Sequence, residues 1–286
     1  MGLETCRVLV ARGAKVYLAA RSEEKASAAM DDICKSTGKK DIHFLKIDLA
    51  DLASVRKAAE EYMSKELELH VLINNAGVLY SPGIGPQTTQ GYDIQFGVHV
   101  LGHYFFTKLL MPTLLRTAEG EVSGAPCLVR VVSVSSDAHE LTAPSQGIVW
   151  ESLQKGDAAI PTRKKLVGHR LYGQSKLGVV LISSELARRY GDQGVVAISL
   201  HPGGVDSELL RNLHPIIAWI VKKTRIYPVT LGVTTSLYAA TSEAALEMNG
   251  EYLTAWGRRQ VPSKHAYNLE MAEKVWTWCE EQATGF

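Results

Sequence analysis

Short apolar runs alternate with amphipathic segments along most of the chain. Five largely apolar runs predict strands: Lys15–Ala20, Ile42–Ile47, His70–Asn74, Cys127–Val134 and Val195–His201. Runs of this kind are typical of strands that are covered on both faces, as in parallel sheets. Helical periodicity connects them, in Glu23–Ser36, Leu52–Lys65, Tyr92–Arg116 and Leu171–Tyr190. This alternation predicts the α/β class: a Rossmann-like, doubly wound parallel sheet between two layers of helices.

The chain is predicted to form one domain over residues 1–286. A single α/β domain can reach this length, and the sequence contains no internal repeat, low-complexity tract or linker rich in Pro, Gly or Ser. Two stretches interrupt the alternation. Ala138–Arg170 is polar, and its basic cluster Arg163-Lys164-Lys165 is predicted to be a solvated loop. Ser207–Tyr227 carries the apolar patch Ile216–Val221, either a lid over a hydrophobic substrate or a helix packed on the core.

Composition narrows the class of function. A formal net charge of +1 argues against a broad nucleic-acid-binding face, which needs an excess of Lys and Arg. The four cysteines are scattered, which suggests reduced thiols rather than a disulfide framework. Polar and charged residues follow Met1 closely, so no secretory signal is expected, and the longest apolar runs are too short to span a bilayer. A cytoplasmic enzyme is the default expectation.

The strongest chemical signal is Tyr172-Gly-Gln-Ser-Lys176, within a segment of helical periodicity. Residues four apart share one face of a helix, so the Lys176 ammonium can lie near the Tyr172 phenol. A free tyrosine titrates near ~10, and a nearby cation lowers that pKa. Such a phenol can donate a proton to a carbonyl or accept one from an alcohol. The alternative is an aromatic residue packed on the sheet, with Lys176 in solvent.

Small polar residues end three of the predicted strands. They are Ser133-Val-Ser135-Ser136, Asn74-Asn75-Ala76-Gly77 and His201-Pro202-Gly203-Gly204-Val205. The carboxyl ends of parallel strands meet at one edge of a sheet, where ligands bind. A hydroxyl from the serine pair could bond the oxygen that the phenol protonates. Ordinary strand-terminating turns are the alternative for the two glycine-containing segments.

In this order and spacing, these motifs resemble the short-chain dehydrogenase/reductase family over nearly the whole chain. The strings FGVHVLGHYFFTKLL, VSSDAH, GIVWESL and YGQSK are most similar to retinol-dehydrogenase-like and WW-domain-oxidoreductase-like members, although no WW module is present. The resemblance implies an oxidoreductase that transfers hydride between a nicotinamide cofactor and the carbonyl or alcohol of a small, hydrophobic substrate. It also implies homodimers or homotetramers, formed through helices like Tyr92–Arg116 and Leu171–Tyr190.

The resemblance assigns a role to each matching residue. Tyr172 would be the acid/base, Lys176 would lower its pKa and hold the nicotinamide ribose, and Ser136 would polarise the substrate oxygen. The remaining cofactor contacts would come from strand ends and the turns that follow them. Asp48 and Leu49 would contact the adenine, Asn75, Ala76 and Gly77 the adenosine ribose, and Pro202, Gly203, Val205 and Ser207 the nicotinamide.

Arg21 bears on which nicotinamide is used. An acidic residue after the second strand would accept hydrogen bonds from a ribose 2′-hydroxyl and repel a 2′-phosphate. Here the strand ends in Ala19-Ala20-Arg21-Ser22, which offers a guanidinium and a hydroxyl. Arg pairs well with phosphate, so NADP(H) is expected in preference to NAD(H).

His99 is a first departure from the family pattern. It stands where the family has a catalytic asparagine, which helps to hold a water that relays protons toward the lysine. A histidine could continue that relay, impair it, or only be a satisfied helix residue. His99 and His103 stand four apart, but no HExxH glutamate accompanies them, so no metal site is predicted.

The start of the sequence is a second departure. The family begins with a strand and a TGxxxGIG loop that binds the pyrophosphate, and Gly2 resembles the last glycine of that loop. We therefore expect a truncated chain that lacks the strand, which leaves a slot of about 10 Å inside the sheet. Weak cofactor binding follows from that expectation. A catalytically impaired or silent scaffold that retains the fold is the alternative function.

Overall fold

The computed structural model describes residues 1–80, 83–125, 127–205 and 227–286. Ser207 and the apolar patch Ile216–Val221 fall outside these ranges, so their predicted places beside the nicotinamide and over the substrate lie outside the described residues.

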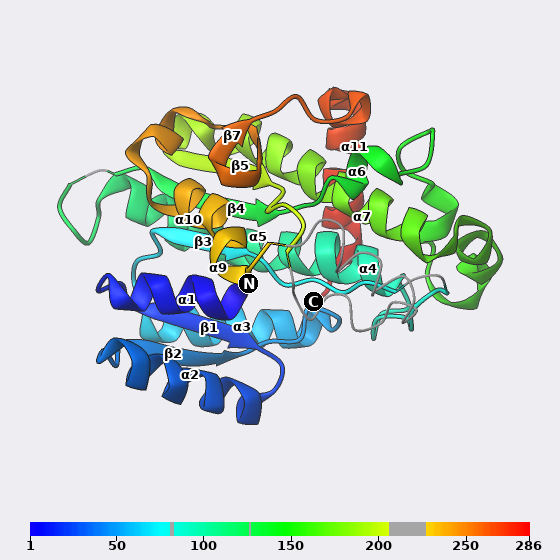
Figure 1. The fold of residues 1–286 in the computed structure, drawn as a ribbon. Coiled ribbons are helices and arrows are strands. Elements are labelled where there is room, and N and C mark those ends of the chain that lie inside the picture. Colours follow the sequence, from blue (N-terminus) through cyan, green and yellow to red (C-terminus); the bar gives the residue numbers. More distant parts are fainter. Residues whose placement is uncertain (81–82, 126, 206–226) are drawn as a thin grey trace.

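The strands form two sheets (Figure 1). The smaller sheet pairs β1 (Val16–Ala20) with β2 (Ile42–Lys46) in parallel. The larger has the order β3 (Val71–Asn74), β4 (Val129–Val134), β5 (Val195–Leu200), β6 (Tyr252–Thr254) and β7 (Arg258–Arg259). All its pairs are parallel except β6 with β7. The predicted Rossmann-like class is confirmed. The described strands do not join β1 to β3, and this interruption is where the slot was expected.

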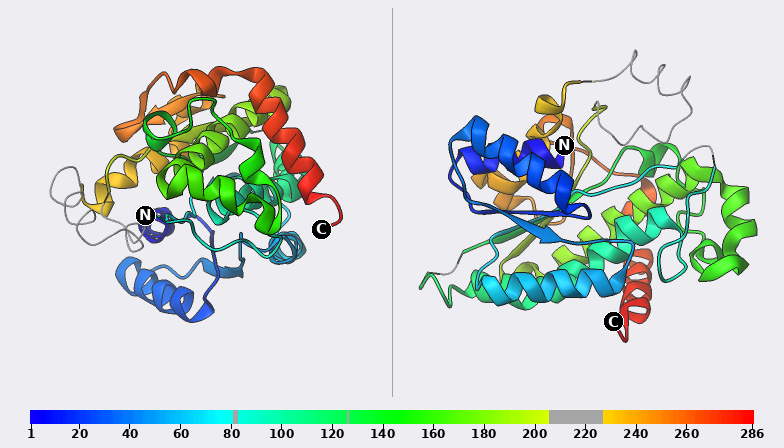
Figure 2. Two further views of the ribbon diagram at one scale, coloured as in Figure 1. Left: turned by 90° about the vertical axis from the view of Figure 1, so that its right-hand side faces the viewer. Right: turned by 90° about the horizontal axis from the view of Figure 1, so that it is seen from below.

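Helices cover both faces of the strands, which gives three layers (Figure 2). On one face lie α1 (Gly2–Ala11), α2 (Glu23–Thr37) and α10 (Thr234–Thr241). On the other lie α3 (Leu52–Lys65), α5 (His103–Glu119) and α7 (Ile160–Tyr190), and α11 (Leu269–Ala283) packs outside α5 and α7. The shorter helical segments are α4 (Ile94–Phe96), η1 (Gly97–Gly102), α6 (Ala138–Leu141), η2 (Trp150–Leu153), η3 (Gly156–Ala159), η4 (Gly191–Gln193), α9 (Val229–Gly232), η6 (Glu243–Glu247), η7 (Ala255–Gly257) and η8 (Lys264–Tyr267).

Local signals fix where the helices around β1 and β2 begin and end. The Ser22 hydroxyl accepts from the amide of Lys25 at 3.3 Å and so caps the start of α2. Helix α2 ends at Gly38, whose φ of 69° is the left-handed conformation that glycine adopts without strain. The Asp51 carboxylate caps α3 in the same way, through the amide of Ala53 at 3.1 Å.

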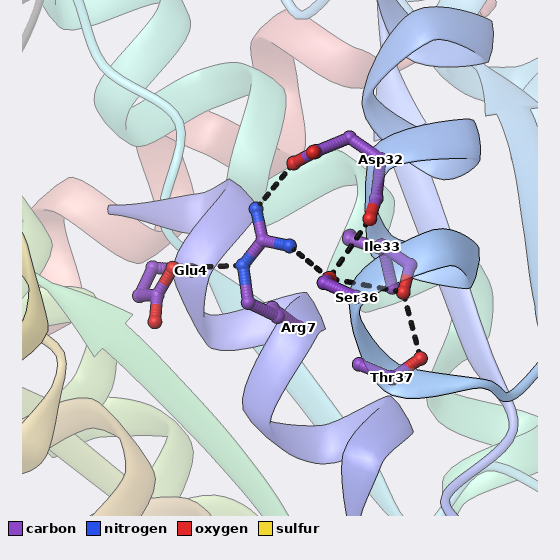
Figure 3. Close-up of polar contacts among 6 residues, drawn as sticks. All are labelled: Glu4, Arg7, Asp32, Ile33, Ser36 and Thr37. Carbon is purple, nitrogen blue, oxygen red and sulfur yellow. Dashed lines mark hydrogen bonds and ion pairs between the residues drawn. The ribbon is translucent and has the colours of Figure 1, made fainter.

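Helix α1 is attached to α2 by one arginine (Figure 3). The Arg7 guanidinium donates to Asp32 at 2.7 Å and Ser36 at 2.5 Å on α2, and to Glu4 on its own helix at 3.1 Å. Below these contacts, Ile33 is buried in an apolar cluster shared with β1 and β2. Exposed ion pairs contribute little to stability, so burial of that cluster supplies most of the attachment.

The basic cluster in the Ala138–Arg170 insertion is helical rather than a loop, and of its three side chains Lys164 and Lys165 are exposed whereas Arg163 is buried. It lies in the first turns of α7, and Arg163 is only 2% exposed. Its guanidinium donates to the carbonyl oxygens of Ser152 at 2.9 Å and Gln154 at 2.6 Å. The prediction was wrong about the loop and about Arg163, because carbonyl oxygens at the end of η2 accept the arginine's hydrogen bonds inside the protein. It holds for Lys164 and Lys165, which lie in solvent.

Strands β4 and β5 are buried along their whole length, as continuous apolar runs predicted. They therefore hold the residues after their carboxyl ends on a rigid base.

Within the part of the chain that the structure describes, no helix has the length and apolar character needed to cross a membrane.

Candidate active site

Three strand ends and one helix place the predicted chemical residues together. Asn75 follows β3, Ser136 follows β4 and Pro202 follows β5, all at the carboxyl edge of the larger sheet. Helix α7 packs against β4 and β5 and carries Tyr172 and Lys176 beside that edge. The strand order thus joins segments that are far apart in sequence.

The hydroxyl of Ser136 lies close enough to the phenol of Tyr172 to act on its pKa. Tyr172 is 8% exposed, and this burial raises the pKa of its phenol, whereas the nearby Ser136 hydroxyl acts to lower it. The Ser136 hydroxyl also donates to Asp137 Oδ1 at 2.9 Å and accepts from the amide of Ala138 at 3.2 Å. Two of the three side chains expected to converge therefore lie close together.

The third, Lys176, lies directly below. Its Nζ is 5.7 Å from the centre of the Tyr172 ring and donates to the Val134 carbonyl at 2.8 Å. The side chain is not in solvent, since Lys176 is 4% exposed, and burial lowers its pKa to about 7. The expected lowering of the Tyr172 pKa by Lys176 is not what the structure gives. Desolvation of the phenol outweighs the other effects and raises that pKa.

His99 occupies a π-helical turn beside the tyrosine. The predicted helix Tyr92–Arg116 is in fact α4, the π-helix η1 and α5 in succession. His99 is 1% exposed, and its ring meets the Tyr172 ring edge-on with centroids 5.6 Å apart. Its Nε2 accepts from the Val78 amide at 2.9 Å, and its Nδ1 lies 2.8 Å from Ser175 Oγ. Both nitrogens are thus bound by protein groups, which leaves neither for a metal.

The loop after β3 runs close to this cluster. A Cβ added to Gly77 would lie 3.1 Å from His99 Nε2, and one added to Gly2 would lie 2.8 Å from Asn75 Nδ2. Gly2, at the start of α1, is therefore packed on the same loop as Asn75 and Gly77. Ala76, between them, is exposed.

The turn after β5 also has the backbone that its sequence predicts. Gly203 has a φ of 90°, in the left-handed region that favours glycine, and it follows Pro202 directly. Val205 forms an isolated parallel bridge with Tyr227.

The other predicted cofactor residues belong to the β1–β2 unit. Asp48 closes a turn after β2, because its Oδ1 accepts from the Ala50 amide at 2.9 Å. Leu49 is buried, with its carbonyl under Gly102 of η1. Arg21 is exposed at the end of β1, next to the residue that caps α2.

Three further polar residues around Ser136 were missed by sequence reasoning. The Asp137 carboxylate lies 3.8 Å from His201 Nε2. His139 donates from Nδ1 to the Ser136 carbonyl at 2.6 Å and accepts at Nε2 from the Ser263 amide at 3.2 Å. Their signal was available, because titratable residues next to the ends of β4 and β5 must lie beside a site built on that edge.

Comparison with known proteins shows the family of the chain. The sequence model of the family described as short chain dehydrogenase matches residues 1–146. A short-chain dehydrogenase/reductase of Armillaria gallica is 44% identical over 100% of this chain and 87% of its own. Retinol dehydrogenase 12 of Mus musculus is 35% identical over 96% of this chain and 80% of its own.

Solved structures share the fold. A protein from Mycobacterium Paratuberculosis is 28% identical, with a TM-score of 0.69 over 99% of this chain and 90% of that one. The NADPH-bound carbonyl reductase from chicken fatty liver shares the fold at 18% identity, with a TM-score of 0.64 over 91% of this chain and 94% of that one. The chain belongs to the short-chain dehydrogenase/reductase family of oxidoreductases and is of the retinol-dehydrogenase-like kind.

Proposed function

We propose that this chain interconverts the carbonyl and alcohol forms of a small hydrophobic substrate, with NADP(H) preferred over NAD(H). The observation that carries the proposal is the Tyr172 phenol, close to the Ser136 hydroxyl and with the buried Lys176 Nζ 5.7 Å from the centre of its ring. When bound, the nicotinamide supplies or accepts the hydride.

The phenol of Tyr172 is the proton donor in the direction of reduction. Its raised pKa keeps the proton on the phenol until a carbonyl oxygen gains charge and takes it. The Ser136 hydroxyl, which now donates to Asp137, turns to donate to the same oxygen. The Lys176 ammonium stabilises the phenolate that is left. Each group thus favours the charge that develops during the reaction.

The residues present fit a hydroxyl-bearing cofactor. An ammonium has three N–H donors. Within the described part of the chain, the Lys176 ammonium donates to the Val134 carbonyl. Two donors are left for the nicotinamide ribose, with Pro202 and Gly203 on the nicotinamide side. Arg21, exposed beside the N-terminus of α2, would pair with a 2′-phosphate. On this arrangement NADP(H) gains an ion pair that NAD(H) lacks.

The substrate class is supported by the kinship. One relative is named as a retinol dehydrogenase, and retinol is an apolar alcohol.

The four cysteines are free, which supports a reducing compartment such as the cytoplasm.

The resemblance implies a homodimer or homotetramer formed through helices such as α5 and α7, and in this chain another helix lies on them. Helix α11 covers these helices, and its Trp276 is buried against the Tyr104 ring, with centroids 4.9 Å apart. The Arg189 guanidinium lies 4.8 Å from the Trp276 ring, and Tyr92 donates to Gln282 at 2.7 Å. We therefore propose that this face packs within one chain. Light scattering at micromolar concentration tests this proposal. A dimer that dissociates when residues of α11 are substituted would contradict it.

The proposed activity is tested by NADPH oxidation with a panel of apolar aldehydes and ketones. We expect carbonyl-dependent oxidation, with NADH a poorer donor. If no carbonyl accelerates NADPH oxidation although NADPH binds, the proposed activity is wrong.

A silent scaffold is the second candidate, and the interruption between β1 and β3 favours it. That interruption adjoins Gly2 and Asn75, the two residues expected beside the phosphates and ribose. Calorimetry separates the candidates, because a scaffold of this kind would not bind NADPH even at millimolar concentration.

A further inference from the structure

We propose that His99 is a positioning residue that holds the loop of residues 75–78 against α7, and that it does not itself transfer protons. The proposal rests on the proposed function in one respect, that this loop lines the cofactor. It selects among the three roles that the sequence left open for His99.

The hydrogen bonds around the imidazole have only one consistent direction. The Val78 backbone N–H can only donate, so His99 Nε2, 2.9 Å away, must be the nitrogen without a proton. The proton is then on Nδ1, which donates to Ser175 Oγ at 2.8 Å. Ser175 in turn donates to the Tyr172 carbonyl at 2.7 Å. The loop is therefore linked through one neutral ring to the turn of α7 that carries the acid/base.

This arrangement leaves no nitrogen for a proton relay. Protonation of Nε2 would break the bond to Val78 and place a second cation close to Lys176. Burial, followed by the charges of Lys176 and His103, lowers the pKa of His99 well below its usual value. The imidazole therefore keeps one tautomer across neutral pH.

The link sets the width of the site. Residue 77 is glycine, and a Cβ there would lie 3.1 Å from His99 Nε2 and 3.7 Å from Lys176 Nζ. The loop backbone thus runs close to both the imidazole and the ammonium, with little room between for a side chain at residue 77. Loss of the hydrogen bond from Val78 to His99 would free the loop of residues 75–78, while α7 keeps its place.

Two substitutions separate the halves of the link. The His99→Asn amide lies near the former Nδ1 and can still bond Ser175, but it does not reach Val78. The His99→Gln amide lies near the former Nε2 and can accept from Val78, but it leaves Ser175. For H99N we expect faster hydrogen exchange at the Val78 amide, an NADPH Kd about tenfold higher and little change in kcat. For H99Q we expect near-normal Val78 exchange and Kd, with kcat about tenfold lower.

The tautomer gives a readout that needs no turnover. Nitrogen NMR of the wild-type protein should show the His99 ring as the Nδ1–H form, without titration between about pH 5.5 and 8. His70→Gln, which removes an exposed histidine just before β3, is the matched control and should change none of these quantities.

The outcomes are distinct. A His99 ring that titrates in this range, or an H99N protein with wild-type Val78 exchange and NADPH Kd, would overturn the proposal. If the tautomer and exchange results are as expected but no carbonyl is reduced, the positioning role stands and the proposed function fails.

Discussion

The Lys176 ammonium donates to the Val134 carbonyl at 2.8 Å, so the cation beneath Tyr172 is held by the end of β4. The Ser135 hydroxyl strengthens the same attachment by donating to the Lys176 carbonyl at 2.7 Å. Strand β4 thus positions two parts of the site, since Ser136 follows shortly after its last residue. This explains how a buried lysine is kept close to a phenol that it does not directly hydrogen-bond.

Replacing Lys176 should change how stability depends on pH. Burial lowers its pKa from 10.5 to about 7, so the unfolded chain binds this proton more tightly. The destabilisation of the folded state by this buried ammonium is complete below about pH 7, and it disappears as pH rises through 10.5. The free energy of unfolding of Lys176→Met, taken relative to wild type, should therefore be a few kcal/mol higher at pH 7 than at pH 10. Urea unfolding at the two pH values measures this. An equal difference at both would show that the ammonium is not desolvated.

Removing the Ser136 hydroxyl should slow the chemical step. The hydroxyl lies close to the phenol of Tyr172 and is the proposed second donor to the substrate oxygen. Ser136→Ala should lower kcat about a hundredfold and leave the NADPH Kd nearly unchanged. Steady-state kinetics and calorimetry give both values, with Ser64→Ala on exposed α3 as the control. A kcat within twofold of wild type would exclude this role.

Arg21 should decide between the two nicotinamides. Arg21→Asp would remove the proposed partner of a 2′-phosphate and add a carboxylate that accepts from a 2′-hydroxyl. The ratio of kcat/KM for NADPH to that for NADH should fall at least tenfold. Arg12→Ala, at the exposed end of α1, serves as the control. An unchanged ratio would mean that Arg21 does not contact the adenosine ribose.

Acid should destabilise the protein through its buried histidines. Burial lowers the pKa of His103 from 6.5 to about 4, so the unfolded state takes up a proton first as pH falls below 6.5. Stability is then lost between about pH 6.5 and 4. His103→Asn can keep the bond to the His99 carbonyl and should lose about 2 kcal/mol less than wild type between pH 7 and 5. Identical losses in the two proteins would show that the fold does not lower the pKa of His103.

Much of the fold could be predicted because periodicity reports burial. The bounds of α3 were predicted to the residue, and β4 and β5 were recognised because both faces of these strands are apolar. Helix α11 was not recognised, although its Trp276 and Cys279 are in the core. The π-turn at His99 was missed as well. A shift from four-residue to five-residue hydrogen bonding leaves no trace in the spacing of apolar residues.

The site shows the same division. The convergence of Ser136, Tyr172 and Lys176 could be predicted, because strand order brings the segments together. The direction in which the pKa of Tyr172 is shifted could not be predicted. A lysine four residues away suggested a lowered pKa for Tyr172, but the depth at which the phenol is buried raises it, and burial depth depends on the packing of the whole fold.

The proton-donor role of Tyr172 is tested most directly by removing its hydroxyl alone. With one carbonyl substrate and saturating NADPH, Tyr172→Phe should have a kcat/KM at least a hundredfold below wild type, with the NADPH Kd unchanged. A Tyr172→Phe protein that reduces the same substrate at the wild-type rate would contradict the account.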